Sequence, residues 1–181
     1  MKKEHPILFS TNMVNAILNG NKTMTRRVVK PQPMYSDDFI ANVVPLWLKP
    51  NEYVNEYCKY KVGDRLWVRE AFAFDKSCDR YSPKYVTNNM SFVWYKNTLD
   101  IKQIGKWRPS IFMPRWASRI TLEITSIKVE RVNQILNTDV TKEGFDDIVT
   151  FKILWDKLNN KRGYGWKSNC WVWIVEFKLC Q

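Results

Sequence analysis

The chain has 181 residues, which is enough for one domain and too few for two of ordinary size. A hydrophobic share of 45% supports a buried core, and no apolar run approaches the roughly 20 residues that cross a bilayer. The 29 Lys and Arg outnumber the 18 Asp and Glu and give a formal charge of +11. This charge favours a polyanionic partner, RNA, a nucleotide or DNA, over a basic protein without a specific partner.

The sulfur and imidazole groups offer no metal-binding pattern. Cys58, Cys78, Cys170 and Cys180 form no CxxC pair, and His5 is the single histidine of the chain. We therefore expect no metal and no cofactor. The N-terminal residues lack the apolar segment of a secretory signal, which predicts a cytoplasmic protein with reduced cysteines and no membrane association.

The first part of the chain is predicted as strand, helix, turn and strand. Ile7–Phe9 is a short apolar segment that is predicted as a strand. Apolar residues then recur at helical spacing. Ser10 or Thr11 is the expected N-cap of this helix, and Gly20 is its expected stop. A second strand follows over Thr25–Lys30.

Four further segments are typical of strands. Three of them are Arg65–Glu70, Ser91–Tyr95 and the long segment Arg119–Val132, in which apolar residues alternate. The last is Trp171–Leu179, with alternation throughout. Scattered strands with a few short helices predict an α+β fold, in which a small, curved β-sheet or barrel has helices packed outside it.

Two helices are expected between these last strands. Thr138 would cap a short helix that ends near Glu143. Thr150 would cap a longer one, whose apolar stripe spans Phe151–Leu158 at helical spacing. No repeat is present, so we expect a single domain over residues 1–181.

The turn after the first helix carries the side chains that are best suited to catalysis. Lys22 and Thr25 are three positions apart, and a turn brings such residues to within about 7 Å at Cα. A neutral lysine can take the proton of a threonine hydroxyl, and burial together with the cations Arg26 and Arg27 would lower the pKa of Lys22. Glu143, at the expected C-terminal end of its helix, opposes the helix dipole.

Each of these residues also has a structural interpretation. Lys22 and Arg26 can bind a phosphate without any catalysis, and Thr25 can be an ordinary β-branched strand residue. Glu143 can pair with an arginine and hold its helix in place.

Arginines beside aromatic residues suggest a second kind of site. Such pairs can bind phosphate and stack on a nucleobase. The alternative is that the tryptophans are core residues, that the arginines are solvated and that Gly163–Trp166 is a plain turn. The candidate ligand-binding residues of the whole chain are Arg26, Arg27, Arg69, Arg115, Trp116, Arg119, Tyr164 and Trp166.

Several motifs resemble those of the ASCH domain family, in the order in which that family has them. They are Gly20, Lys22, Thr25 and Arg27 in the first turn, Gly63–Asp64 before Trp67–Arg69, Glu143–Gly144, and the closing strand Trp171–Phe177. Trp107–Ser110 and Met113–Arg119 resemble the group of the family carried by phages and prophages. The resemblance covers roughly 7–33, 61–72 and 107–179.

The resemblance implies a PUA-like fold, which is a small mixed β-barrel associated with RNA. One branch of the family removes the acetyl group from acetylated cytidine, and its Lys, Thr and Glu fall on Lys22, Thr25 and Glu143. Another member is a ribonuclease, and a binding module without catalysis is the alternative. Compared with the small amidohydrolases of the family, this chain has insertions at about 34–60 and 73–106.

Overall fold

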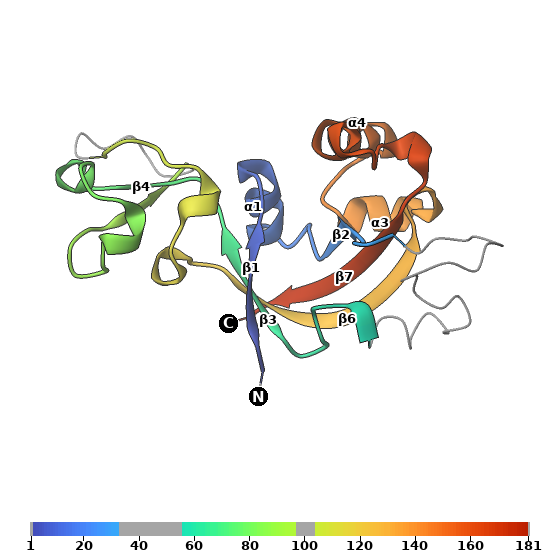
Figure 1. Ribbon diagram of the computed structural model, residues 1–181, viewed down its shortest axis with the longest axis horizontal. Coiled ribbons are helices and arrows are strands. Elements are labelled where there is room, and N and C mark those ends of the chain that lie inside the picture. The colour runs from blue at the N-terminus through green and yellow to red at the C-terminus, as the bar shows by residue number, and fades with distance from the viewer. Residues whose placement is uncertain (1, 33–55, 97–103, 181) are drawn as a thin grey trace. The chain divides into compact units, whose positions relative to one another are not determined.

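The computed structural model describes residues 2–32, 56–96 and 104–180 (Figure 1). Its internal contacts divide the chain into two compact units. The first unit comprises Met1–Asn19, Asp64–Glu123 and Leu179–Gln181, and the second comprises Gly20–Gly63 and Ile124–Lys178. A single domain over 1–181 stays a prediction.

In the first unit, three strands pair in the order β1-β3-β6. Strand β1 (Glu4–Leu8) runs parallel to β3 (Arg65–Arg69), and β3 runs antiparallel to the beginning of β6 (Thr121–Arg131). Helix α1 (Thr11–Leu18) follows β1, and the Ser10 hydroxyl accepts a hydrogen bond from the amide of Met13, as expected of its N-cap. Its inward positions are buried, so the helix is amphipathic as predicted.

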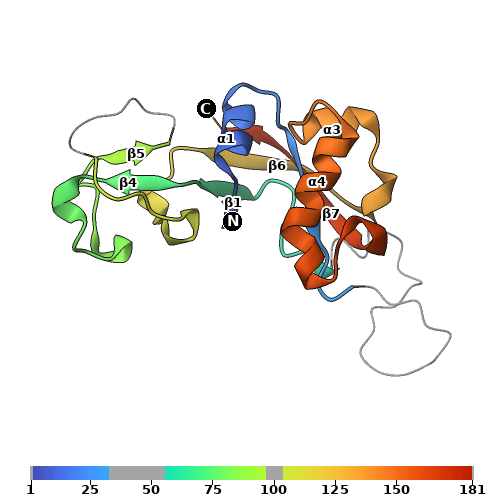
Figure 2. The ribbon, with the colours of Figure 1, turned by 90° about the horizontal axis from the view of Figure 1, so that it is seen from above.

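A two-stranded sheet completes the first unit. Strand β4 (Phe72–Phe74) pairs antiparallel with β5 (Val93–Tyr95), as Figure 2 shows. Part of the expected insertion 73–106 is therefore ordered around a core of its own, and 97–103 lies outside the described residues. The buried members of that core are Phe72, Phe74, Cys78, Val86, Met113 and Ala117.

In the second unit, the strand order is β6-β7-β2. Strand β2 (Met24–Val28) pairs antiparallel with β7 (Trp171–Leu179). Helices α3 (Asn137–Lys142) and α4 (Ile148–Asn159) cover one face of these strands (Figure 1). The apolar core between helices and strands consists of Met24, Val132, Val140, Phe151, Trp155, Cys170, Val172 and Ile174.

Short 3-10 helices connect the longer elements. They lie at Lys76–Cys78, Pro83–Tyr85, Ser110–Phe112 and Arg115–Ala117 in the first unit, and at Val132–Gln134, Asn160–Arg162 and Trp166–Ser168 in the second. Within the described ranges, every helix is too short or too polar to cross a bilayer.

The α+β class is confirmed, but the strand pairings of the described residues close no barrel in either unit. Strand β1 contains Pro6, which has no amide hydrogen and is typical of an edge strand that stays unpaired on one side. Of the expected insertion 34–60, residues 34–55 lie outside the described residues.

Two predicted helix caps were wrong. Helix α3 begins at Asn137, with Leu136 rather than Thr138 at the cap position. For α4 the cap is Asp147, whose Oδ1 accepts a hydrogen bond of 2.8 Å from the amide of Thr150. The side chain of Asp is a stronger N-cap than that of Thr, and it lies three positions earlier, at the usual spacing.

Candidate active site

A backbone bridge joins the turn before β2 to the end of α3. Lys22 and Glu143 form an isolated antiparallel bridge, and the amide of Thr23 donates to the carbonyl of Lys142 at 2.9 Å. The backbone carbonyl of Thr23 accepts a hydrogen bond of 2.8 Å from the amide of Phe177 in β7. The segment that carries Lys22 is therefore held between a helix end and a central strand.

The amine of Lys22 is fully engaged. Its Nζ donates to Glu143 Oε2 at 2.8 Å, to the carbonyl of Glu143 at 2.7 Å and to the carbonyl of Met24 at 2.8 Å. An ammonium has three protons, and these three bonds match them. The exposed fractions are only 1% for Lys22 and 3% for Glu143, so the ion pair lies in a low-dielectric environment.

Glu143 occupies the end of α3, as the sequence predicts. It is the C-cap residue of the helix, and Gly144 follows with φ of 83°, a conformation that favours glycine. The carboxylate therefore meets the negative end of the helix dipole, and nearby cations compensate for that unfavourable field.

Arg26 supplies the second cation. Its Nη1 lies 3.4 Å from Glu143 Oε1, and its Nη2 lies 2.6 Å from Asp139 Oδ2. The structural interpretation of Glu143, a pairing with an arginine, is thus confirmed. Sequence reasoning missed Asp139, although it stands four residues before Glu143, a spacing that places two side chains on the same face of a helix.

Burial changes the acidity of these cations. It lowers the pKa of Lys22, while the carboxylate of Glu143 acts in the opposite direction and Arg27 and Arg26 add to the lowering. Burial also lowers the pKa of Arg27, against the attraction of Tyr60 and Glu143. For Lys22 this is the direction that a proton-accepting amine requires.

Thr25 is the remaining member of the predicted catalytic set. It is 3% exposed, lies in β2 and pairs with Val175 of β7. Side chains alternate along a strand, so Thr25 and Arg27 leave β2 on the face opposite to Arg26. The structure joins Lys22 to Glu143 directly, and the approach of a Thr25 hydroxyl to Lys22 stays a prediction.

Two of the predicted ligand-binding arginines of the first unit, Arg115 and Arg119, have carboxylate partners within it. Arg115 binds Glu4 through Nε at 2.8 Å and Nη2 at 3.1 Å. Arg119 binds Glu70 with two bonds of 2.9 Å, and its guanidinium lies 4.0 Å from the ring centroid of Tyr95. A ligand at either arginine would have to share it with these contacts.

Trp116 and Arg69 have internal contacts in the same unit. Trp116 stacks on Phe74 with ring centroids 5.4 Å apart, and its Nε1 donates to the carbonyl of Val86 at 3.0 Å. The guanidinium of Arg69 lies 4.4 Å from the ring centroid of Trp67. These contacts agree with the structural interpretation of Trp116 as a core residue, while its role in binding stays a prediction.

Tyr164 and Trp166 of the second unit lie partly buried against the α4 core. Lys30 Nζ lies 5.3 Å from the ring centroid of Tyr164, and Lys152 Nζ lies 4.8 Å from that of Trp166. Both aromatic rings therefore already have a cation near them.

In the described part of the chain, no three His, Cys, Asp or Glu side chains gather in a way that could hold a metal ion.

Comparison with known proteins locates this architecture among solved structures. A crystal structure of a protein from Enterococcus faecalis V583, described as a member of the DUF984 family, matches with a TM-score of 0.50 and 8% identity. The match covers 99% of this chain and 81% of that one. The chain shares its fold with this protein. At such a low identity the likeness concerns the fold alone.

A second solved structure also matches the chain. It is the ASCH domain from Lactobacillus crispatus JV V101, with 10% identity, a TM-score of 0.46, and coverage of 98% of this chain and 79% of that one. No family model matches the sequence. No curated protein matches it either.

Proposed function

We propose that the chain is a nucleoside- or RNA-directed hydrolase of the ASCH type. It would remove an acyl group from the base of a modified cytidine, with Lys22, Thr25 and Glu143 as the reacting groups. The observation that best supports this function is the buried contact of 2.8 Å between Lys22 Nζ and Glu143 Oε2. These residues are 121 positions apart in the chain, and the resemblance assigns the amine and the carboxyl of the reaction to them.

The reaction would begin with a proton moving from the Lys22 ammonium to the Glu143 carboxylate. The burial that lowers the pKa of Lys22 favours the neutral amine. The Thr25 hydroxyl attacks the amide carbonyl carbon, and Lys22 takes the hydroxyl proton. The carbon–nitrogen bond breaks as Glu143 protonates the leaving amine of cytidine.

An ester between the acyl group and Thr25 remains after this step. Water attacks its carbonyl carbon, the ester bond breaks, and the Thr25 oxygen regains a proton. One water is consumed for each amide, and the products are the deacylated cytidine and a carboxylic acid. Arg26 is a positioning residue, since it lies 3.4 Å from Glu143 Oε1 and can fix the carboxylate.

The direct test is to incubate the protein with acetylcytidine and to follow cytidine and acetate by liquid chromatography. We expect turnover by the natural chain and none by Thr25→Ala. The matched control is Thr23→Ala, because Thr23 is exposed in the same segment and should leave the rate unchanged. Glu143→Gln should lower kcat by about 100-fold or more if it donates the proton.

The result has to be separated from loss of folding. Each variant is compared by circular dichroism at the assay temperature, since Lys22 and Glu143 are buried. Equal activity of Thr25→Ala and the natural chain would end the threonine mechanism. Absence of turnover on both free acetylcytidine and RNA that contains it would end the hydrolase proposal.

The second candidate function is a binding module for RNA or DNA without catalysis. The net charge of +11 and the arginine over Tyr95 at 4.0 Å favour it. Binding to nucleic acid should then weaken linearly with salt on logarithmic axes, with no acyl release. Binding that does not respond to salt, or no binding, would count against this function.

A further inference from the structure

A short loop of the first unit exposes basic and aromatic side chains in alternation. Arg80 and Tyr81 are followed by Lys84 and Tyr85, and all four are exposed. We define Arg80–Tyr85 as the basic–aromatic loop. Neither the proposed hydrolysis nor the candidate residues discussed above use it.

Each tyrosine of the loop has a cation at its ring. The guanidinium of Arg80 lies 4.9 Å from the ring centroid of Tyr81, and Lys84 Nζ lies 4.6 Å from that of Tyr85. The exposed fractions are 37% for Tyr81 and 64% for Tyr85, which is high for large aromatic residues. An accessible ring with an adjacent cation matches the two parts of a nucleotide, a base that stacks and a phosphate that is anionic.

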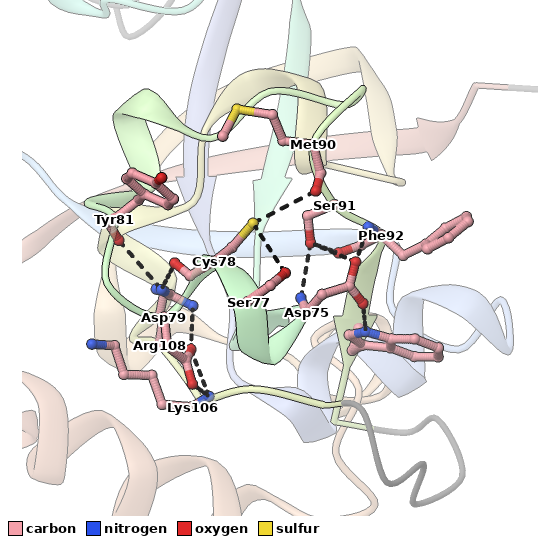
Figure 3. A network of polar contacts seen from close by, with 11 residues as sticks. Asp75, Ser77, Cys78, Asp79, Tyr81, Met90, Ser91, Phe92, Lys106 and Arg108 are labelled. Carbon is pink, nitrogen blue, oxygen red and sulfur yellow. Dashed lines mark hydrogen bonds and ion pairs between the residues drawn. The ribbon is translucent and has the colours of Figure 1, made fainter.

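Two acidic residues near the loop, Asp75 and Asp79, are half-buried and accept hydrogen bonds within the protein. Asp75 accepts hydrogen bonds from the Ser91 hydroxyl, the amide of Phe92 and the Trp94 indole (Figure 3). Asp79 accepts from the amide of Lys106 at 2.9 Å. Both carboxylates are thus engaged internally.

Among residues 56–96 and 104–180, the exposed charge near the loop is mainly positive. Arg108 Nη1 lies 3.4 Å from Asp79 Oδ1 and compensates its charge. The hydrogen bond from the backbone amide of Lys106 to Asp79 places Lys106 beside the loop, and Lys106 is exposed. Together with Arg80 and Lys84 it gives the surface three cations.

The backbone of the loop is held in place. Arg108 Nη2 donates to the carbonyl of Cys78 at 3.1 Å and to that of Tyr81 at 3.4 Å (Figure 3). Val86, directly after the loop, is buried in the core that also contains Cys78. A surface already fixed in this way loses little conformational freedom when a ligand binds.

We propose that the basic–aromatic loop binds single-stranded nucleic acid, with Tyr81 and Tyr85 stacking on bases and Arg80, Lys84 and Lys106 contacting phosphates. The exposed positive charge favours this partner over a protein surface, because a protein partner would leave the excess cations without matching anions. Stacking requires unpaired bases, so a duplex should bind more weakly. This inference does not rest on the proposed hydrolysis.

Fluorescence anisotropy with labelled oligouridylate, oligothymidylate and a duplex of equal length tests the proposal. We expect both single strands to bind more tightly than the duplex. Tyr81→Ala with Tyr85→Ala should weaken binding of the single strands by at least about 30-fold, the low end for loss of two stacked bases. The aromatic control is Tyr57→Ala, an exposed tyrosine of the second unit.

A charge-matched pair of variants tests the phosphate contacts. Arg80→Gln with Lys84→Gln should lower the slope of log affinity against log salt by about 1.4, as expected for two contacts to a single strand. Lys128→Gln with Lys178→Gln removes the same charge from exposed positions in the second unit and should leave the slope unchanged.

Three outcomes would overturn the inference. They are no binding of either single strand at low salt, unchanged binding by the tyrosine variants, and equal loss in the loop variants and their controls. The two single strands separate RNA from DNA as the ligand. Acetylcytidine turnover by the loop variants should equal that of the natural chain, so failure of this inference and failure of the proposed hydrolysis are distinguishable.

Discussion

Removal of either partner of the Lys22–Glu143 ion pair should destabilise the protein, but by unequal amounts. Both side chains are buried, and their charged atoms are 2.8 Å apart. Breaking a buried ion pair from one side typically costs about 3–5 kcal/mol, because the remaining charge loses its partner in a low-dielectric environment. Glu143→Gln and Lys22→Met are the variants that preserve size most closely.

The charges around the pair set the order of the two variants. Lys22, Arg26 and the adjacent Arg27 are balanced by Glu143 and Asp139. Without the glutamate, three cations share one carboxylate, so the cost should be near about 5 kcal/mol. Without the lysine, two cations remain with two carboxylates, and the cost should be near about 3 kcal/mol or less.

The destabilisation by Glu143→Gln should also depend on pH. Burial lowers the pKa of Lys22, and loss of the carboxylate that raises it should lower this pKa further. Between the pKa of Lys22 in the folded variant and that in the unfolded chain, the unfolded chain holds a proton that the folded variant has released. The stability of the variant therefore rises with pH in this interval, by about 1.4 kcal/mol per pH unit at most. Its deficit against the natural chain should therefore shrink as the pH rises.

Guanidinium unfolding followed by circular dichroism measures these free energies. Asp146→Asn is the matched control, because Asp146 is exposed and three positions from Glu143. It should change the free energy of unfolding by less than about 0.5 kcal/mol. A cost below about 1 kcal/mol for Glu143→Gln, or a larger cost for Lys22→Met, would refute the reasoning from buried charge.

Three further predictions follow from local contacts. Asp147→Ala should lower the thermal midpoint more than Thr150→Ala at pH 7. Hydrogen bonds from Thr150 lower the pKa of Asp147 in the folded protein. The difference between the two variants should therefore vanish as acid protonates the Asp147 carboxylate. Phe74→Ala, at a fully buried site, should cost about 3–5 kcal/mol in chemical unfolding. Glu4→Gln removes the carboxylate whose pKa is lowered by Arg115. It should lower the free energy of unfolding by less than about 1 kcal/mol at neutral pH, and this loss should disappear on acidification.

Elements with a strong local pattern were predictable. The last strand was predicted with the bounds that β7 has, because its alternating residues keep a period of two throughout. The start of α4 was harder, since Asp147 and Thr150 are both good caps and only the backbone distinguishes them. Asp147 has extended backbone angles, with φ of −146° and ψ of 159°.

The candidate site was less predictable from residues alone. Local patterns placed Glu143 at a helix end and Lys22 in a turn, but their approach across 121 positions was implied only by the family resemblance. Likewise, no local rule shows that Glu70 binds Arg119 or that Glu4 binds Arg115, since these partners are 49 and 111 positions apart. Long-range pairing depends on the complete fold, whereas propensities describe only neighbours.

The pairing of β2 with β7 has a consequence for the order of folding during synthesis. Met24 lies opposite Glu176, so β2 leaves the ribosome long before its partner strand has been made. Contacts between distant parts of a chain slow folding, because a large loop must close before any strand pairing compensates for it. The nascent chain therefore carries an unpaired strand for most of its translation, and this interval is when a chaperone would be of most use to it.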